Sequence, residues 1–209
     1  MSNIKIGRMV VGTVQTNCYF LQNTDTNEVV VVDPGAKGER IYEEMTNRGY
    51  TIKAVLLTHG HFDHVMGVDG IRKAAGVKVY LGEEESKLIE NADLNVSAMF
   101  GTPYTTKADI LVKDGEELEL AGIKMKVIHT PGHTAGGVCY YLEEEKILLC
   151  GDTLFAESVG RTDFPTSSAS ALVTAIREKL FALPDEVYVY PGHGPTTTIG
   201  HEKENNPFI

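Results

Sequence analysis

One short segment of the sequence concentrates side chains that could bind a metal ion. Its residues are His59, Gly60, His61, Phe62, Asp63 and His64, which include three of the seven histidines of the chain. Neutral imidazole and carboxylate groups are good ligands for zinc and other first-row cations, and a tight turn can direct several of them at one point. A polar loop with histidines placed by chance is the alternative interpretation, and their density disfavours it.

Three later turns supply further candidate ligands. His133 lies in a Thr-Pro-Gly-His-Thr stretch, Asp152 follows Cys-Gly, and His193 lies in Pro-Gly-His-Gly. Each follows a glycine, which permits unusual backbone angles and close approach. The candidate donors are therefore His59, His61, Asp63, His64, His133, Asp152 and His193. Seven are too many for one tetrahedral ion, whereas two cations about 3.5–4 Å apart can hold attacking and leaving oxygens and acidify water.

Alternating strands and helices must position these side chains. The expected strands are Lys5–Val11, Asn17–Leu21, Glu28–Val32, Lys53–Leu57, Val77–Leu81, Lys124–His129, Val138–Leu142, Lys146–Cys150 and Glu186–Tyr190. Helices are expected over 38–48, with Gly49 as a C-terminal cap, and near 65–75, 83–91 and 168–182. Four strands run directly into the polar segments, so the chemistry is predicted at strand ends. With 209 residues and no linker, we expect a single domain over residues 1–209.

Composition narrows the class of protein. Nineteen basic and 29 acidic residues give a net charge of −10, which opposes binding to nucleic acid or anionic lipid. The longest apolar stretches, such as Val29–Val32, fall far short of the roughly 20 residues that cross a bilayer. The first residues do not form a secretory signal, and the three cysteines are widely spaced. We therefore expect a cytoplasmic protein that binds neither nucleic acid nor a membrane.

The motifs together resemble a known family. Besides the segment 58–64 they are Asp33-Pro34-Gly35, Thr130-Pro131-Gly132-His133-Thr134, Gly151-Asp152-Thr153-Leu154-Phe155, Gly160-Arg161-Thr162-Asp163-Phe164-Pro165, Pro191-Gly192-His193-Gly194-Pro195 and the tail Asn206-Pro207-Phe208. An H-x-H-x-D-H pattern after a strand, with later G-H, G-D and G-H motifs, is similar to the metallo-β-lactamase superfamily over nearly the whole chain. The closer likeness is to glyoxalase II-type hydrolases in their short bacterial branch.

This resemblance implies a fold and a division of ligands. The fold is an α/β, four-layer αβ/βα sandwich of two mixed β-sheets with outer helices. One cation takes His59, His61 and His133, and the other takes Asp63, His64 and His193. Asp152 bridges the two cations, for which zinc is expected and iron or manganese are alternatives.

The resemblance also implies a function. The chain is expected to be a metallo-hydrolase that cleaves a small-molecule thioester with a hydroxide that bridges the two metals. Asp63 is expected to ligate one of the metals and to orient the hydroxide. Arg161 is expected to bind an anionic group of the substrate, or else to tie down its own loop through Asp163. Longer glyoxalase II enzymes bind glutathione with a lysine and a tyrosine near this position, so recognition of glutathione stays open. Oligomeric assembly is left open as well.

Two other classes of function remain as alternatives. Glyoxalase II-like sulfur dioxygenases share the Gly-Arg-Thr-Asp-Phe segment, and they would use one iron on His133, Asp152 and His193 to oxidise a persulfide. A non-catalytic module with a structural metal is the other, although seven donors exceed the four of a closed site.

Several residues receive structural interpretations. His129 is expected to orient its neighbours and His201 to lie at a solvated helix end. The cysteines are interpreted as buried small hydrophobes, and Tyr140 and Tyr141 as core residues on opposite faces of a strand. The run of glutamates at 83–85 is expected to be a charged first turn of a helix.

Overall fold

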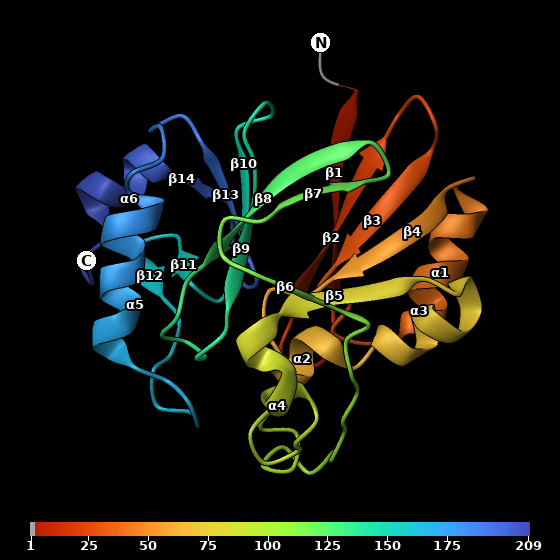
Figure 1. Cartoon of the computed structure of the whole chain (residues 1–209), viewed down its shortest axis with the longest axis horizontal. Coiled ribbons are helices and arrows are strands. Elements are labelled where there is room, and N and C mark those ends of the chain that lie inside the picture. The colour runs from red at the N-terminus through yellow and green to blue at the C-terminus, as the bar shows by residue number, and fades with distance from the viewer. Residues whose placement is uncertain (1–2) are drawn as a thin grey trace.

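The computed structural model describes residues 3–209 and contains two six-stranded sheets that pack face to face (Figure 1). The first sheet consists, in spatial order, of β1 (Ile4–Val11), β2 (Thr16–Asn23), β3 (Glu28–Val32), β4 (Thr51–Leu56), β5 (Lys78–Gly82) and β6 (Ile110–Val112). β1, β2 and β3 pair antiparallel, whereas β3 to β6 pair parallel. The first sheet is therefore mixed.

The second sheet is also mixed. In spatial order it contains β14 (Thr197–Thr198), β13 (Tyr188–Pro191), β10 (Ile147–Gly151), β9 (Val138–Leu142), β8 (Ile123–His129) and β7 (Glu117–Leu120). β10 pairs parallel with β13, and the other neighbours pair antiparallel. A separate ladder joins β11 (Leu154–Phe155) and β12 (Ser158–Val159) just after β10.

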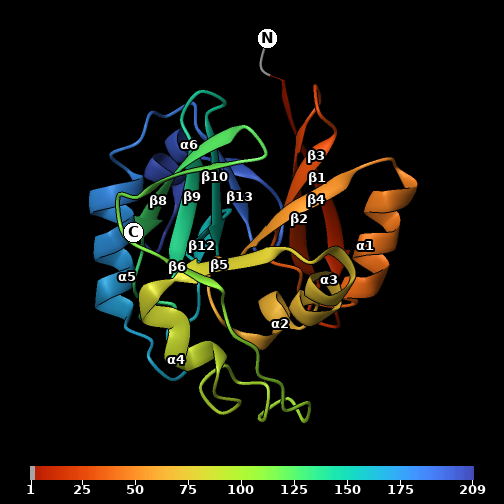
Figure 2. The same cartoon turned by 45° about the vertical axis from the view of Figure 1, so that its right-hand side comes forward.

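Six α-helices in the described part of the chain accompany the two sheets. They are α1 (Gly38–Asn47), α2 (Phe62–Val65), α3 (Val68–Ala75), α4 (Ser86–Ile89), α5 (Ala169–Ala175) and α6 (Ile199–Asn205). α1 and α3 lie outside the first sheet, while α5 and α6 lie outside the second (Figures 1 and 2). This arrangement confirms the predicted four-layer sandwich. No helix within residues 3–209 has both the length and the apolar character needed to cross a bilayer.

Two predicted helices differ from the observed ones. The helix expected over 65–75 begins only at Val68, as α3, and is separated from the short α2 by Gly67, whose amide donates to the Pro34 carbonyl at 2.7 Å. A Cβ atom at Gly67 would lie 2.5 Å from that oxygen, so the close approach of the two backbones requires glycine here. The helix expected over 83–91 consists of a 3₁₀ turn, Glu83–Glu85, followed by the short α4.

The valine-rich strand β3 explains how the layers hold together. Val30 and Val32 pack in the core between the two sheets, whereas Val29 and Val31 pack in the core beneath α1 and α3. Successive strand side chains point to opposite faces, so a strand buried on both faces is apolar at every position. A third core lies between the second sheet and the segments that form α5 and α6.

Tyr140 and Tyr141 lie on opposite faces of β9, as predicted. Tyr140 is fully buried between the sheets, and its hydroxyl donates to the Leu57 carbonyl at 2.9 Å, directly before the histidine-rich segment. Tyr141 packs in the outer core beneath α5 and α6.

We expect Tyr140→Phe to lower the free energy of unfolding by about 1–3 kcal/mol. The variant loses a buried hydrogen bond and leaves the buried Leu57 carbonyl without this donor. Chemical denaturation of the metal-free protein measures this loss. Tyr141→Phe is the matched control, since it keeps the contact between Tyr140 and Leu57. An equal loss in both variants would contradict this role of the Tyr140 hydroxyl.

Candidate metal centre

The structure brings all seven predicted donors together at the ends of strands. His59 and His61 follow β4, and Asp63 and His64 lie on α2. His133 follows β8, whereas Asp152 and His193 follow the parallel neighbours β10 and β13. Both sheets therefore contribute to one cluster, at the strand ends where the polar motifs predicted it.

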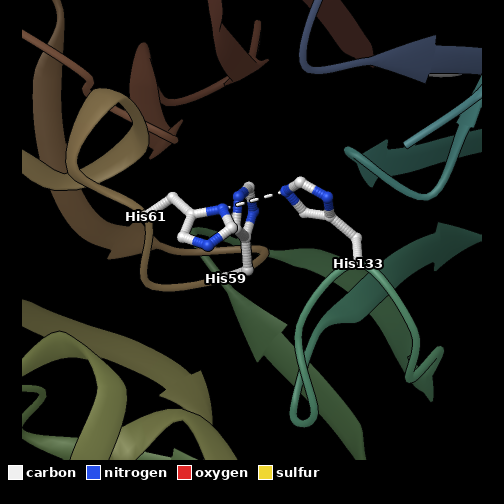
Figure 3. Close-up of side chains that lie close together, drawn as sticks. All are labelled: His59, His61 and His133. Atoms are coloured by element: carbon white, nitrogen blue, oxygen red, sulfur yellow. Dashed lines mark hydrogen bonds between the residues drawn. The ribbon is translucent and has the colours of Figure 1, made fainter. Parts of the chain in front are cut away.

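The first group of donors consists of His59, His61 and His133. One ring nitrogen of each lies within 4.8 Å of those of the other two, and all three residues are buried. The rings converge on a common space in Figure 3, where His61 Nδ1 lies 2.9 Å from His133 Nε2. Two nitrogens bound to one tetrahedral zinc lie roughly 3.3 Å apart, so this group has dimensions close to those of a ligand set.

The second group consists of Asp63, His64 and His193. Asp63 Oδ2 lies 3.1 Å from His193 Nε2 and 3.4 Å from His64 Nε2. His193 is the more open side of this group, since 28% of its side chain is exposed, whereas His64 is fully buried. The cluster is therefore more accessible to a substrate from the side of His193 and Asp63.

Asp152 lies between the two groups. Its Oδ1 is 3.4 Å from His64 Nε2, while its Oδ2 is 3.6 Å from His133 Nε2 and 3.5 Å from His193 Nε2. Asp152 also forms a third candidate ligand group with His59 and His64. One carboxylate thus faces donors of both groups, which is the geometry a bridging ligand needs.

Several atoms of the cluster are buried without a hydrogen-bond partner among residues 3–209. They are Nε2 of His59, His61 and His64 and Oδ1 of Asp152. Leaving a buried polar atom unpaired costs about 1–3 kcal/mol each, and native proteins rarely tolerate several in one place. Nε2 of His59 and of His64 and Oδ1 of Asp152 belong to types that bind divalent cations, so the cluster fits metal ions and binding would offset this cost.

Burial and neighbouring charges set the protonation of the donors. Burial lowers the pKa of His61 to about 3 and lowers the pKa of His59 well below its ordinary value, with the other imidazoles adding to the effect. Burial opposes ionisation of Asp152, but the nearby histidines outweigh it and hold the pKa of that carboxyl well below its ordinary value. At neutral pH His59 and His61 therefore offer neutral imidazoles beside the Asp152 carboxylate, which are the forms that bind metal.

A second set of residues orients the donors, and sequence reasoning assigned it no role. Asp33 Oδ2 lies 3.0 Å from His64 Nδ1, and Asp33 also accepts hydrogen bonds from the amide and hydroxyl of Thr58. Thr16 donates its hydroxyl to Asp63 Oδ2 at 2.8 Å. A proton on His64 Nδ1 leaves the Nε2 lone pair free for a cation. The Asp-Pro-Gly motif pointed to Asp33, whereas nothing in the pattern around Thr16 indicated its contact.

The side chain of Arg161 is engaged by its own loop. Its guanidinium donates to both oxygens of Asp163, at 2.9 and 2.7 Å, and lies 4.2 Å from the centre of the Phe164 ring. The Arg161 carbonyl accepts a hydrogen bond from His133 Nδ1 at 2.8 Å. The loop therefore orients His133 through the backbone, and substrate binding by the Arg161 side chain stays a prediction.

The remaining histidines and the cysteines lie outside the candidate ligand groups. His129 Nε2 lies 2.9 Å from the Ala135 carbonyl, within the turn of His133, and His201 pairs with Glu157 at 3.0 Å. All three cysteines are buried, and burial raises the pKa of each thiol. These placements agree with the structural interpretations made from the sequence.

Comparison with known families and curated proteins gives a consistent result. Residues 11–193 match the family model described as the metallo-beta-lactamase superfamily. The chain is 38% identical to the probable metallo-hydrolase YqgX of Bacillus subtilis, with 99% of this chain and 98% of that protein covered. It is 35% identical to the hydroxyacylglutathione hydrolase GloC of Haemophilus influenzae, again over 99% and 98% of the two chains.

Solved structures show the same fold. BLEG-1, described as a B3 metallo-beta-lactamase, is 39% identical and superposes with a TM-score of 0.93 over 98% of this chain and 99% of its own. TTHA1623 in a di-iron-bound form is 35% identical, with a TM-score of 0.86 over 97% of this chain and 100% of its own.

We expect zinc to stabilise the protein, because cations would satisfy the unpaired buried nitrogens. At 100 times the dissociation constant, binding adds about 2.7 kcal/mol per site, which raises the melting temperature by roughly 5–10 °C for a chain of this size. Differential scanning fluorimetry with and without a chelator measures the shift. His61→Ala should reduce it, while the remote His201→Asn should keep it; an unchanged melting temperature in wild type would contradict the metal centre.

Gly192→Ala should weaken metal binding by at least 10-fold. A Cβ atom there would lie 2.2 Å from Asp152 Oδ1 and 2.6 Å from His64 Cε1, so it would displace two donors. Competition with a chromophoric chelator measures the affinity. Gly7→Ala is the control, since its Cβ would meet Phe20 at an ordinary 3.7 Å. Equal affinity in both variants would show that the two donors are not required.

Proposed function

The chain belongs to the metallo-beta-lactamase superfamily, and we propose that it hydrolyses small-molecule thioesters of the hydroxyacylglutathione type with two divalent cations. The observation that carries the proposal is the position of Asp152 between two complete groups of donors. A two-ion centre clamps both the attacking and the leaving atom of a hydrolysis, which a single ion does not. The net charge of −10 favours a small molecule over nucleic acid as substrate.

The similarity to GloC supports the substrate class. That relative is named a hydroxyacylglutathione hydrolase, and its 35% identity extends over nearly the whole of both chains. YqgX, at 38% identity, is named only a probable metallo-hydrolase, so the family does not by itself specify the acyl or thiol part.

Water rather than a side chain is the proposed nucleophile. Each of the three cysteines is buried with a raised thiol pKa, which opposes formation of a reactive thiolate. When bound, the cations polarise the thioester carbonyl, acidify water and stabilise the leaving thiolate.

Asp63 is the proposed catalytic carboxylate. The Thr16 hydroxyl and the His193 ring both approach Asp63 Oδ2, which fixes the carboxylate at the more open side of the cluster. In that position Asp63 can accept a hydrogen bond from the attacking water while it also serves as a ligand. Its neighbour His193 is partly exposed, so the substrate carbonyl would enter beside these two residues.

Zinc is the proposed metal, with iron and manganese as alternatives. The donors are imidazole nitrogens and carboxylate oxygens without thiolate, and such a set suits all three cations. The di-iron form of TTHA1623 keeps iron among the alternatives.

The arrangement of donors favours hydrolysis over persulfide oxidation. A one-iron dioxygenase would use His133, Asp152 and His193 together. Asp152 Oδ2 approaches both of these histidines, yet within residues 3–209 the two histidines fall into different ligand groups. A protein with this geometry is better suited to two cations than to one facial triad.

We expect the zinc-loaded protein to hydrolyse S-lactoylglutathione, with turnover abolished by a chelator. Asp63→Asn should lower kcat/KM roughly 100-fold or more, whereas Asp185→Asn, at an exposed pair with Lys203, should leave it unchanged. Thioester cleavage is followed at the absorbance of the thioester bond, in parallel with β-lactam hydrolysis and with oxygen uptake on glutathione persulfide.

Hydrolysis of β-lactams without thioester cleavage would contradict the proposed substrate class and favour the activity for which BLEG-1 is named. Oxygen uptake by a protein with a single iron, without hydrolysis, would establish the dioxygenase instead.

A further inference from the structure

Glu85 is a fully buried carboxylate outside the ligand groups. It ends the 3₁₀ turn after β5, and its exposed fraction is 0%, whereas Glu83 and Glu84 in the same turn are exposed. The three glutamates form the predicted first turn of a helix, but Glu85 alone among them points into the protein interior. A carboxylate is rarely buried without partners that compensate for lost hydration.

Both oxygens of Glu85 accept backbone hydrogen bonds from the metal centre's own turns. Oε2 accepts from the Gly60 amide at 2.8 Å, and Oε1 accepts from the Gly136 amide at 2.8 Å. Gly60 lies between His59 and His61, and Gly136 lies three residues after His133. One carboxylate therefore joins the two backbone turns that carry the first ligand group.

The packing around these contacts leaves little room for adjustment. A Cβ atom at Gly136 would lie 2.5 Å from the Glu85 amide nitrogen, and one at Gly60 would lie 2.7 Å from Leu88 Cδ2. Such distances are shorter than real contacts, so both turns lie directly against the Glu85 segment. A change in the Glu85 carboxylate would consequently be transmitted to both turns.

The second ligand group has different supports. Thr16 bonds Asp63, and Asp33 bonds His64. Asn17 donates to the carbonyls of Pro191 and Gly194, which flank His193. Glu85 takes part in none of these contacts. Thr58 is the residue that links the two groups, since its hydroxyl donates to Asp33 and lies 3.1 Å from His59 Nδ1.

We propose that Glu85 is a positioning residue that fixes the spacing between the His59–His61 turn and the His133 turn. Glu85 thereby sets the affinity for the cation held by His59, His61 and His133, and it does not affect the affinity of the second ligand group. The inference rests on the two-ion centre of the proposed function. Only a carboxylate can accept both amides, because glutamine has nearly the same shape but presents an NH₂ group to one of the two N–H donors. Outer partners of metal ligands typically change affinity 10–100-fold when removed.

The test measures zinc affinity by competition with a chromophoric chelator in backgrounds that retain one group at a time. His193→Ala weakens the second group, and in that background Glu85→Gln should lower the remaining affinity 10–100-fold. His61→Ala weakens the first group, and there Glu85→Gln should leave the remaining affinity unchanged within about 2-fold. Thr16→Val should give the opposite pattern, because it loses only the contact with Asp63.

Two matched controls separate positioning from folding. Glu84→Gln changes an exposed neighbour and should have no effect, and Leu88→Ala loosens the adjacent helix while keeping the carboxylate. The proposal would be overturned if Glu85→Gln lowered zinc affinity equally in both backgrounds, or in neither. It would also be overturned if Glu85→Gln failed to fold while Leu88→Ala folded. A wild-type protein that binds two zinc ions but cleaves no thioester would contradict the proposed function and leave this inference standing.

Discussion

Imidazole nitrogens are buried without a hydrogen-bond partner from residues 3–209 where the two sheets meet. His59, His61 and His64 each place Nε2 in the protein interior with no partner in the described chain, and Asp152 adds an unpaired oxygen. Folding alone gains nothing from this arrangement, since each such atom costs free energy that a hydrogen bond or a cation must offset. The two sheets, the glycine-bounded turns and the surrounding polar residues together hold these atoms in place.

The supports differ for the two ligand groups, and this difference has a functional meaning. The first group lies deeper. The Arg161 carbonyl accepts a hydrogen bond from the His133 ring, and the Glu85 carboxylate accepts from the backbone amides of both turns. The second group is more open at His193 and is held by Thr16, Asp33 and Asn17. A buried first group next to a more accessible second group suits a centre that substrate approaches from one side. Asp152 couples the two groups, because its carboxylate lies against His133 of the first group and against His64 and His193 of the second.

The sequence predicted most of the fold and the whole set of candidate donors, for physical reasons that particular residues show. The run Val29–Val32 predicted a buried strand, and the structure buries it on both faces. The glycines before His133, Asp152 and His193 indicated turns whose backbone packs closely against neighbouring segments. The roles of Thr16 and Glu85 could not be predicted, because each depends on a partner far along the chain. Glu85 in particular is one of three consecutive glutamates, and only the tertiary structure shows that it alone points inward.

We propose that this chain holds two cations in two adjoining groups of donors. A crystal structure of the zinc-loaded protein, with anomalous difference maps collected on both sides of the zinc edge, would locate them. We expect two zinc peaks about 3.5–4 Å apart, one bounded by His59, His61 and His133 and the other by Asp63, His64 and His193, with Asp152 between them. A single peak bound by His133, Asp152 and His193, or no peak within the cluster, would rule out the two-ion centre.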